Sequence, residues 1–230
     1  MKRYLITGAS RGIGRAIAER LAEPEVRLFL HGRNREALAE TGRRVEAKGA
    51  HAVLLCYDLL EISAVEQMLV ELNEQPLDAL INNAGIAVVK PLDELSIAEW
   101  QSTLAVNVTA PFLLTQRLTK TMPAGGSVVN ILSIAAKNGF AGWSSYCASK
   151  FALEGFSQAV RAELRPRGIR VINLYPAATD TEIWDSVAGE WSRQKMLPAA
   201  EVAEAVAYAL SRPEAVAVEG ISLTNSSGAL

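Results

Sequence analysis

The chain has 230 residues, of which 50% are hydrophobic and 21% are charged. This length and composition are typical of one globular α/β domain and exclude a disordered chain. The formal net charge is −2, from 23 basic and 25 acidic side chains with no long run of either sign, so the sequence predicts no nucleic-acid partner. No apolar stretch approaches the roughly 20 residues of a membrane span, so we expect a soluble protein without a membrane partner.

The cysteines and histidines give no sign of a disulfide or a metal site. Cys56 and Cys147 lie in apolar surroundings, with no second Cys or His at metal-ligand spacing. The sequence therefore predicts no metal, and a reducing cytoplasm fits this pattern. His31 and His51 stand at predicted strand edges without a partner pattern, so we interpret them as surface or hydrogen-bonded side chains rather than as a catalytic pair.

Short apolar runs alternate with helical patterns along the whole chain. The apolar runs predict strands at 3–7, 26–31, 52–57, 79–82, 127–133, 170–175 and 217–224. The helical patterns fall at 13–21, 35–47, 63–72, 100–121, 146–165 and 199–210. Because parallel neighbouring strands need crossover connections, the alternation predicts a doubly wound parallel sheet of about seven strands, a Rossmann fold, as a single domain over 1–230. The irregular segment near 176–198 is expected to cover the substrate.

A glycine-rich turn follows the first predicted strand. Gly8, Gly12 and Gly14 have the spacing Gly-x3-Gly-x-Gly, and a helix is predicted to begin within this turn. Glycines permit a tight turn and close approach of the backbone to a ligand, while a helix N-terminus offers unpaired amides to a pyrophosphate. A plain strand-to-helix connection is the alternative, but the position at the first strand-helix junction favours a dinucleotide site.

The second predicted strand ends at His31 and is followed by Gly32, Arg33 and Asn34, with no acidic residue. An NAD enzyme would carry Asp or Glu here to bind the ribose hydroxyls. Arg33, with Arg11 in the glycine-rich turn, could instead pair with a 2′-phosphate, which an acid would repel. The alternative is that one or both arginines are solvated surface residues. We predict NADP(H) as the cofactor.

A second group of residues carries the chemistry. Tyr146 and Lys150 are four residues apart, so on a helix they share one face. A nearby ammonium stabilises a phenolate, so Lys150 is expected to lower the pKa of Tyr146 and make it a usable acid or base. A half-buried Tyr on an amphipathic helix is the alternative. Ser133 ends the fifth predicted strand, where open α/β sheets present ligand-binding groups. Asn107 lies inside a long predicted helix, which indicates a functional or backbone-bonding use.

These motifs, in the order 7–14, 58, 82–85, 107, 133, 146 and 150, resemble those of the short-chain dehydrogenase/reductase family over nearly the whole chain. The resemblance implies hydride transfer between NADP(H) and a small-molecule carbonyl or alcohol, with Tyr146 as the general acid in reduction. It implies that Ser133 polarises the carbonyl and that Lys150 binds the nicotinamide ribose. Asn107 would hold a water that links Lys150 to solvent. Family members are commonly dimers or tetramers, so we expect a homodimer or homotetramer.

The resemblance also implies a set of cofactor-binding residues, among which Asp58 would bond the adenine. The full set is Gly8, Ser10, Arg11, Gly12, Ile13, Gly14, Arg33, Asp58, Leu59, Asn82, Ala84, Gly85, Tyr146, Lys150, Pro176, Thr179 and Thr181. Ala177 departs from the family's usual Pro-Gly, and it requires a backbone without positive φ or tolerates one at some cost. The tail 223–228 lacks the family's paired glycines and looks like that of sepiapterin-reductase-like members, while other features are similar to 3-oxoacyl-reductase-like members.

Three functions are open at this point. The first is a reductase of a ketone, aldehyde or 3-oxoacyl compound. The second is a catalytically silent NADP(H)-binding redox sensor, since an enzyme-like fold does not guarantee turnover. The third is a structural subunit whose nucleotide only stabilises the fold. Phe140, Trp143 and Trp184 flank the predicted site and either line a substrate pocket or pack beneath a loop.

Overall fold

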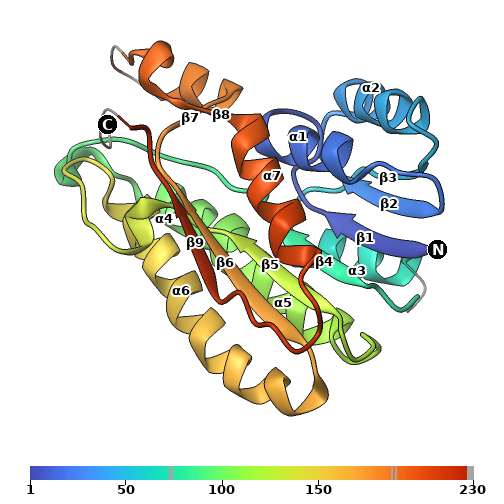
Figure 1. Cartoon of the computed structure of the whole chain (residues 1–230). Helices are drawn as coiled ribbons and strands as arrows, with labels where there is room; N and C mark the ends of the chain where they lie inside the picture. The colour runs from blue at the N-terminus through green and yellow to red at the C-terminus, as the bar shows by residue number, and fades with distance from the viewer. Residues whose placement is uncertain (73–74, 188, 190, 227–230) are drawn as a thin grey trace.

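Seven parallel strands form one twisted sheet in the order β3-β2-β1-β4-β5-β6-β9 in a computed structural model that describes residues 1–72, 75–187, 189 and 191–226 (Figure 1). The strands are β1 Lys2–Ile6, β2 Val26–His31, β3 His51–Leu55, β4 Ala79–Asn82, β5 Ser127–Ile131, β6 Arg170–Pro176 and β9 Gly220–Leu223. The strand order reverses between β1 and β4, and ligands of open α/β sheets bind at such a switch point, outside the carboxyl ends of the strands. The predicted doubly wound Rossmann fold is confirmed.

Helices cover both faces of this sheet. They are α1 Gly12–Leu21, α2 Arg35–Glu46, α3 Ile62–Glu71, α4 Ile97–Leu104, α5 Ala110–Leu118, α6 Ser144–Leu164 and α7 Ala199–Leu210. Side chains alternate across each strand, so Ile6 packs in a core with α1 and α7, while its neighbour Leu5 packs in a second core with α3 and α5. A short parallel pair, β7 Thr179–Asp180 and β8 Leu197–Pro198, lies apart from the main sheet (Figure 1).

The helix predicted at 100–121 is wrong as a single element. The structure has α4, a π-helical turn over Ala105–Thr109, and then α5. The amide of Ala110 bonds the carbonyl of Ala105, five residues back, and Pro111 has no amide hydrogen to continue the helical ladder. Proline is well tolerated in the first turn of a helix, so α5 begins anew at this position.

Three strands are shorter than predicted, and one of them, β3, ends at Leu55 rather than at position 57. β5 ends at Ile131, so Ser133 lies just beyond it at the start of the short turn Ile134–Ala136, and β9 covers only Gly220–Leu223. Residues 227 and 228 of the predicted tail motif lie outside the described residues. No helix in the described part of the chain is long and apolar enough to span a membrane.

Candidate active site

A cavity of about 540 Å³ opens at the carboxyl ends of the strands. Most of the predicted site residues line it, from the glycine-rich turn at one end to Tyr146 and Lys150 further along. Those lining residues are Gly8, Ser10, Arg11, Gly12, Ile13, Arg33, Asp58, Leu59, Ala84, Gly85, Ser133, Tyr146, Lys150, Pro176, Thr179 and Thr181. Gly14, Asn82 and Asn107 are not in the lining. This volume is within the usual range for small-molecule and cofactor sites.

At two positions the glycine-rich turn has a backbone conformation that strongly favours glycine. Gly8 and Gly12 have φ of +68° and +54°, in the left-handed region. At Gly14 an added Cβ would overlap the Gly8 carbonyl oxygen, so the first turn of α1 packs directly on the end of β1. No side chain caps the N-terminus of α1, whose first amides are therefore available to an anion.

Asn83 fastens this turn to the neighbouring strand β4. Its Nδ2 donates to the carbonyls of Thr7 at 2.8 Å and Gly8 at 3.2 Å, while the Thr7 hydroxyl accepts from the amides of Asn83 and Ala84, both at 3.0 Å. The Asn82 side chain points into the sheet and donates to Asn130 at 2.9 Å, so the cofactor contact predicted at this position stays a prediction for its backbone. Side chains alternate along a strand, so adjacent asparagines have opposite surroundings.

His31 supports the same turn from the end of β2. It is buried, its Nε2 donates to the Tyr57 carbonyl at 3.1 Å, and its Nδ1 accepts from the Gly8 amide at 3.4 Å. Burial lowers the pKa of His31 to about 4, so the ring is neutral at physiological pH. The interpretation as a hydrogen-bonded histidine is confirmed, but no sequence pattern indicates its contact with Gly8.

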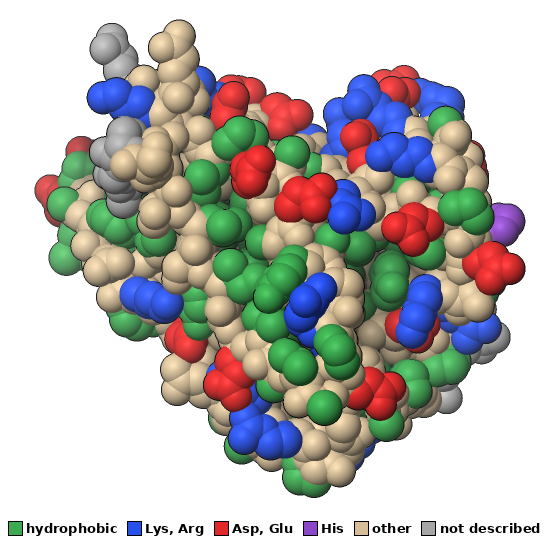
Figure 2. Space-filling model, in the orientation of Figure 1, with side chains coloured by type: hydrophobic (Ala, Val, Ile, Leu, Met, Phe, Trp, Pro, Cys, Tyr) green, Lys and Arg blue, Asp and Glu red, His purple; other side chains and the backbone are tan. Residues whose placement is uncertain are grey.

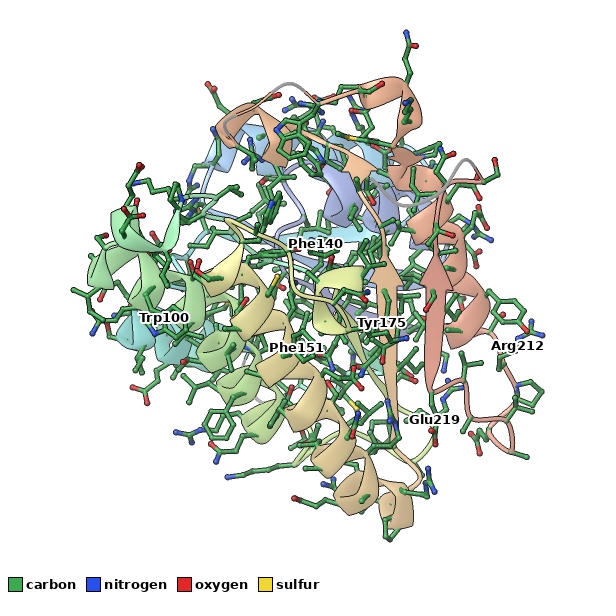
Figure 3. The ribbon with its side chains drawn as sticks, turned by 90° about the vertical axis from the view of Figure 1, so that its left-hand side faces the viewer. Trp100, Phe140, Phe151, Tyr175, Arg212 and Glu219 are labelled. Carbon is green, nitrogen blue, oxygen red and sulfur yellow. The ribbon has the colours of Figure 1, made fainter. Side chains whose placement is uncertain are left out.

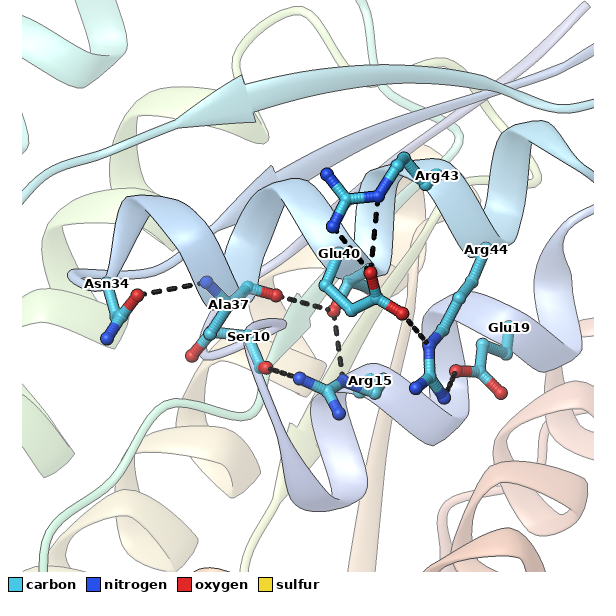
Figure 4. A network of polar contacts seen from close by, with 9 residues as sticks. Ser10, Arg15, Glu19, Asn34, Ala37, Glu40, Arg43 and Arg44 are labelled. Atoms are coloured by element: carbon cyan, nitrogen blue, oxygen red, sulfur yellow. Dashed lines mark hydrogen bonds and ion pairs between the residues drawn. The ribbon is translucent and has the colours of Figure 1, made fainter.

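A polar network joins the glycine-rich turn to α2 (Figure 4). Arg15 of α1 donates through Nε to the Thr41 hydroxyl at 3.1 Å and through Nη2 to the Ser10 carbonyl. The Asn34 side chain accepts from the Ala37 amide at 2.9 Å and so caps α2. This cap fixes the start of α2 directly after Arg33. Arginine and acidic side chains are interspersed over α2, at the upper right of Figure 2.

Arg33 and Asp58 lie together at this end of the cavity. Arg33 Nη1 is 3.7 Å from Asp58 Oδ2, and both side chains are well exposed, at 60% and 39%. An ion pair this exposed contributes little to stability. Arg33 therefore stays free to exchange this partner for an anionic ligand.

Ser133, Tyr146 and Lys150 converge on the middle of the cavity. Ser133 and the Tyr146 hydroxyl are hydrogen bonded to each other. Lys150 is buried, its Nζ donates to the Ile131 carbonyl at 2.9 Å, and it lies 5.5 Å from the centre of the Tyr146 ring. The end of β5 thus orients Lys150 through Ile131 and positions Ser133 two residues further on, while α6 supplies both Tyr146 and Lys150.

The pKa of Tyr146 is shifted in the direction opposite to the one predicted. Burial raises it to about 12, and burial lowers the pKa of Lys150 to about 8. Both shifts have the same cause, since a low-dielectric surrounding disfavours the charged form of each group. Sequence spacing shows that the two groups share a face, but it does not show how deeply they lie.

Both the oxygen and the nitrogen of the Asn107 side-chain amide are hydrogen bonded within the protein. Its Oδ1 accepts from the Ile86 amide at 2.9 Å, and its Nδ2 donates to the Ile86 carbonyl at 2.9 Å and the Ser149 hydroxyl at 3.0 Å. The backbone-bonding use predicted for this residue is confirmed. A Cβ added to Gly85 would lie 3.4 Å from Asn107 Oδ1 and 3.8 Å from Lys150 Nζ, so these two side chains approach each other at Gly85.

The residues after β6 close the cavity opposite the glycine-rich turn. Ala177 has no positive φ, and its amide donates to the Leu223 carbonyl at 2.8 Å, so this departure from the family pattern causes no backbone strain. A Cβ added to Gly12 would be 3.1 Å from the Thr181 side chain. The segment that contains Thr181 therefore packs on the glycine-rich turn.

The fold and this site define a dinucleotide-binding α/β oxidoreductase. The family model described as short chain dehydrogenase matches residues 2–191, and the chain belongs to this family. It is 33% identical to a D-threitol dehydrogenase of Mycolicibacterium smegmatis, over 97% of this chain and 91% of that protein. A sepiapterin reductase of Chlorobaculum tepidum is 32% identical over 97% and 96% of the two chains. A crystal structure of a short chain dehydrogenase from Burkholderia cenocepacia in complex with NADP superposes with a TM-score of 0.89, at 32% identity over 97% and 96% of the two chains.

Proposed function

We propose that this protein transfers a hydride between NADP(H) and a carbonyl or alcohol substrate, with Tyr146 as the general acid and base. The observation that carries the proposal is the convergence of Ser133, Tyr146 and Lys150 in one cavity. The glycine-rich turn lies in the same cavity, so the cofactor and the reacting groups share one space.

The residues present fit a dinucleotide that carries a 2′-phosphate. The uncapped N-terminus of α1 and the close approach of Gly14 to Gly8 would accept the pyrophosphate. Arg11 and Arg33 would hold the 2′-phosphate, and Asp58 would contact the adenine. NADP bound to the similar Burkholderia cenocepacia dehydrogenase supports this choice.

When bound, NADPH supplies the hydride. Because its pKa is about 12, Tyr146 holds its proton at neutral pH and donates it to the substrate oxygen as charge develops there. The Ser133 hydroxyl, bonded to Tyr146, orients that oxygen. Lys150 would bind the nicotinamide ribose. The side-chain amide of Asn107 is bonded to Ile86 and Ser149, so its backbone would hold the water that returns a proton towards Lys150.

A covering segment, an oligomer and a cytoplasmic location complete the proposal. The segment near 176–198, of which positions 188 and 190 lie outside the described residues, would cover the substrate. Arg193 holds it in place by bonding Asp180 at 2.8 Å and the Thr181 carbonyl at 2.7 Å.

We place the protein in the cytoplasm because Cys56 and Cys147 are free. α5 and α6 would pair with a second copy as a homodimer or within a homotetramer.

The alternative of a catalytically silent NADP(H) sensor is not favoured, since the similar proteins are named as dehydrogenases and reductases, and one substitution tests the proposed role of Tyr146. We expect Tyr146→Phe to lower kcat by about 10²- to 10⁴-fold, since it removes the proton donor. The dissociation constant for NADPH, measured by fluorescence titration, stays the same. Tyr208→Phe is the matched control, because Tyr208 is exposed on α7 and does not line the cavity. Unchanged turnover in Tyr146→Phe contradicts the proposed role, and absence of turnover in the unmodified protein favours the sensor.

A further inference from the structure

Three tryptophans from two separate segments meet beside Tyr146. We name Trp143, Trp184 and Trp191 the tryptophan cluster. Trp143 directly precedes α6, and its ring centre is 5.5 Å from that of Tyr146 in an edge-to-face arrangement. Its distances to Trp184 and Trp191 are 5.8 Å and 6.1 Å. All three line the cavity and are half-buried, so each indole keeps surface that a ligand can contact.

The cluster extends an apolar surface from the reacting groups towards the cavity mouth. Phe140 and Val187 line the same part, and Phe140 is 38% exposed. Figure 3 shows Phe140 on the loop that precedes α6, apart from Trp100 on α4. A ring that enters this space meets indole edges and faces, which favour edge-to-face or offset stacking with other aromatic rings.

Charged side chains are distributed unequally among the described lining residues. Apart from Lys150, they are Arg11, Arg33, Asp58 and Glu182. The first three lie at the cofactor end, and Glu182 Oε2 is 3.5 Å from the position of a Cβ on Gly12. None of these is a cation beside the tryptophan cluster. A substrate carboxylate or phosphate would therefore lose its water there without an ion partner, which is costly.

The indole N–H groups of the covering segment are also occupied. Trp184 Nε1 donates to the Thr179 carbonyl at 2.9 Å, and Trp191 Nε1 donates to the Val187 carbonyl at 3.4 Å. These bonds hold the two rings against the main chain and leave their carbon surfaces to the cavity. A polyhydroxylated substrate would bury several hydroxyls against these surfaces without partners, and each unpaired hydroxyl weakens binding.

We propose that this site takes planar, uncharged aromatic ketones, with the ring against the tryptophan cluster and the carbonyl at Tyr146. This inference rests on the proposed function. The ketone carbon gains the hydride of NADPH and its oxygen gains a proton from Tyr146, so the C=O double bond becomes a secondary alcohol and NADPH becomes NADP⁺.

Four matched ketones test the substrate class by affinity and by turnover. Acetophenone and cyclohexyl methyl ketone differ in ring aromaticity, para-acetylbenzoate adds a charge, and dihydroxyacetone is polyhydroxylated. Calorimetry on the NADP⁺-saturated protein measures binding without reduction. We expect acetophenone to bind about tenfold more tightly than its saturated analogue, and about a hundredfold more tightly than the other two. Equal or tighter binding of cyclohexyl methyl ketone or para-acetylbenzoate overturns the inference.

Turnover with NADPH distinguishes this inference from the proposed function. Tight acetophenone binding without reduction of any of the four ketones contradicts the proposed function alone. Reduction of dihydroxyacetone or para-acetylbenzoate together with weak acetophenone binding contradicts the substrate class alone.

A variant pair tests the role of the cluster itself. In Trp191→Leu we expect the dissociation constant of acetophenone to rise about fivefold, because one ring contact is lost, with the value for cyclohexyl methyl ketone and NADPH binding unchanged. Trp100→Leu is the matched control, since Trp100 does not line the cavity, and it leaves all three values unchanged. Equal weakening of both ketones in Trp191→Leu means that Trp191 only packs beneath the loop, and this overturns the inference.

Discussion

Tyr146 and Lys150 are both buried enough to favour their neutral forms, with pKa values of about 12 and 8. A phenol with so high a pKa stays protonated over the whole physiological pH range. It gives up that proton only to an oxygen that becomes strongly basic, as a carbonyl oxygen does when hydride reaches its carbon. In the proposed reaction, Tyr146 would therefore deliver its proton where charge develops, and Ser133, which is bonded to Tyr146, would fix that position.

His31 makes folding stability depend on pH. The pKa of the buried ring is about 4, below the 6.5 of an exposed histidine, so below pH 6.5 the unfolded chain binds a proton that the folded chain does not. Stability is therefore fully present above pH 6.5 and is lost as pH falls towards 4, by about 3 kcal/mol. In His31→Gln, which does not titrate, we expect this part of the loss between pH 7 and 5 to disappear from urea unfolding curves. His51→Gln, at an exposed site, retains it, and an unchanged pH dependence in His31→Gln contradicts the assignment.

Arg33 is expected to set the cofactor preference. Its ion pair with Asp58 is long and exposed, so its charge is available to a 2′-phosphate. Arg33→Asp replaces an attractive charge with a repulsive one, which we expect to raise KM for NADPH roughly tenfold to a hundredfold while KM for NADH stays equal or falls. Arg212→Asp, away from the cavity, is the control. An unchanged ratio of the two KM values means that Arg33 is only a solvated surface residue.

That Ser133, Tyr146 and Lys150 lie together in one cavity was predictable from the sequence, because residue type and order indicate it. The contacts and the pKa of a residue were not predictable where they depend on how deeply its side chain is buried. The sequence does not distinguish Asn82, buried in the sheet, from Asn83, which holds the glycine-rich turn, because that difference depends on strand phase. The direction of the Tyr146 pKa shift likewise depends on depth, and Trp191 joins the site only because the chain folds back over it.

At the scale of elements, the junction of β1 and α1 depends on the missing side chain of Gly14. An added Cβ would overlap the Gly8 carbonyl oxygen and would also meet Asn83 Nδ2, which is held by its bonds to the carbonyls of Thr7 and Gly8. We expect Gly14→Ala to destabilise the fold by about 1–3 kcal/mol and to abolish measurable NADPH binding. Gly42→Ala on α2 is the control, since its Cβ would meet the movable end of the Leu54 side chain at 3.2 Å. Calorimetric melting and NADPH titration measure both effects, and normal NADPH affinity in Gly14→Ala contradicts the expected close packing.

Element positions follow from hydrophobic periodicity, which is why six of the strands and most helices lie close to their predicted ranges. Periodicity misses the break at Ala105–Thr109, because a π-helical turn keeps the same apolar face while it shifts the following helix. The π-helical turn orients Asn107 towards Ile86 and Ser149. A feature that the hydrophobic periodicity does not show therefore positions a residue of the proposed site.

At the scale of the whole molecule, α5 and α6 carry aromatic side chains that the single chain leaves exposed. Phe112 on α5 and Phe151 on α6 are 39% and 47% exposed, and Phe112 contacts Phe156 of α6 edge to face at 5.9 Å. The two helices therefore present one joined apolar surface. Such a surface on a symmetric oligomer pairs with its own copy, and burying it there removes the apolar side chains from water.

We expect Phe151→Arg to shift the protein towards a monomer of 24.7 kDa in sedimentation velocity at micromolar concentration. Two arginines would face each other across a two-fold interface, and their repulsion adds to the lost burial of two phenyl rings. Val70→Arg is the matched control, because Val70 on α3 is 78% exposed and lies on a different helix. NADPH binding persists in both variants, since the cavity of each subunit is lined by its own chain. An unmodified protein that already sediments as a monomer, or an unchanged oligomer in Phe151→Arg, shows that α5 and α6 do not form the interface.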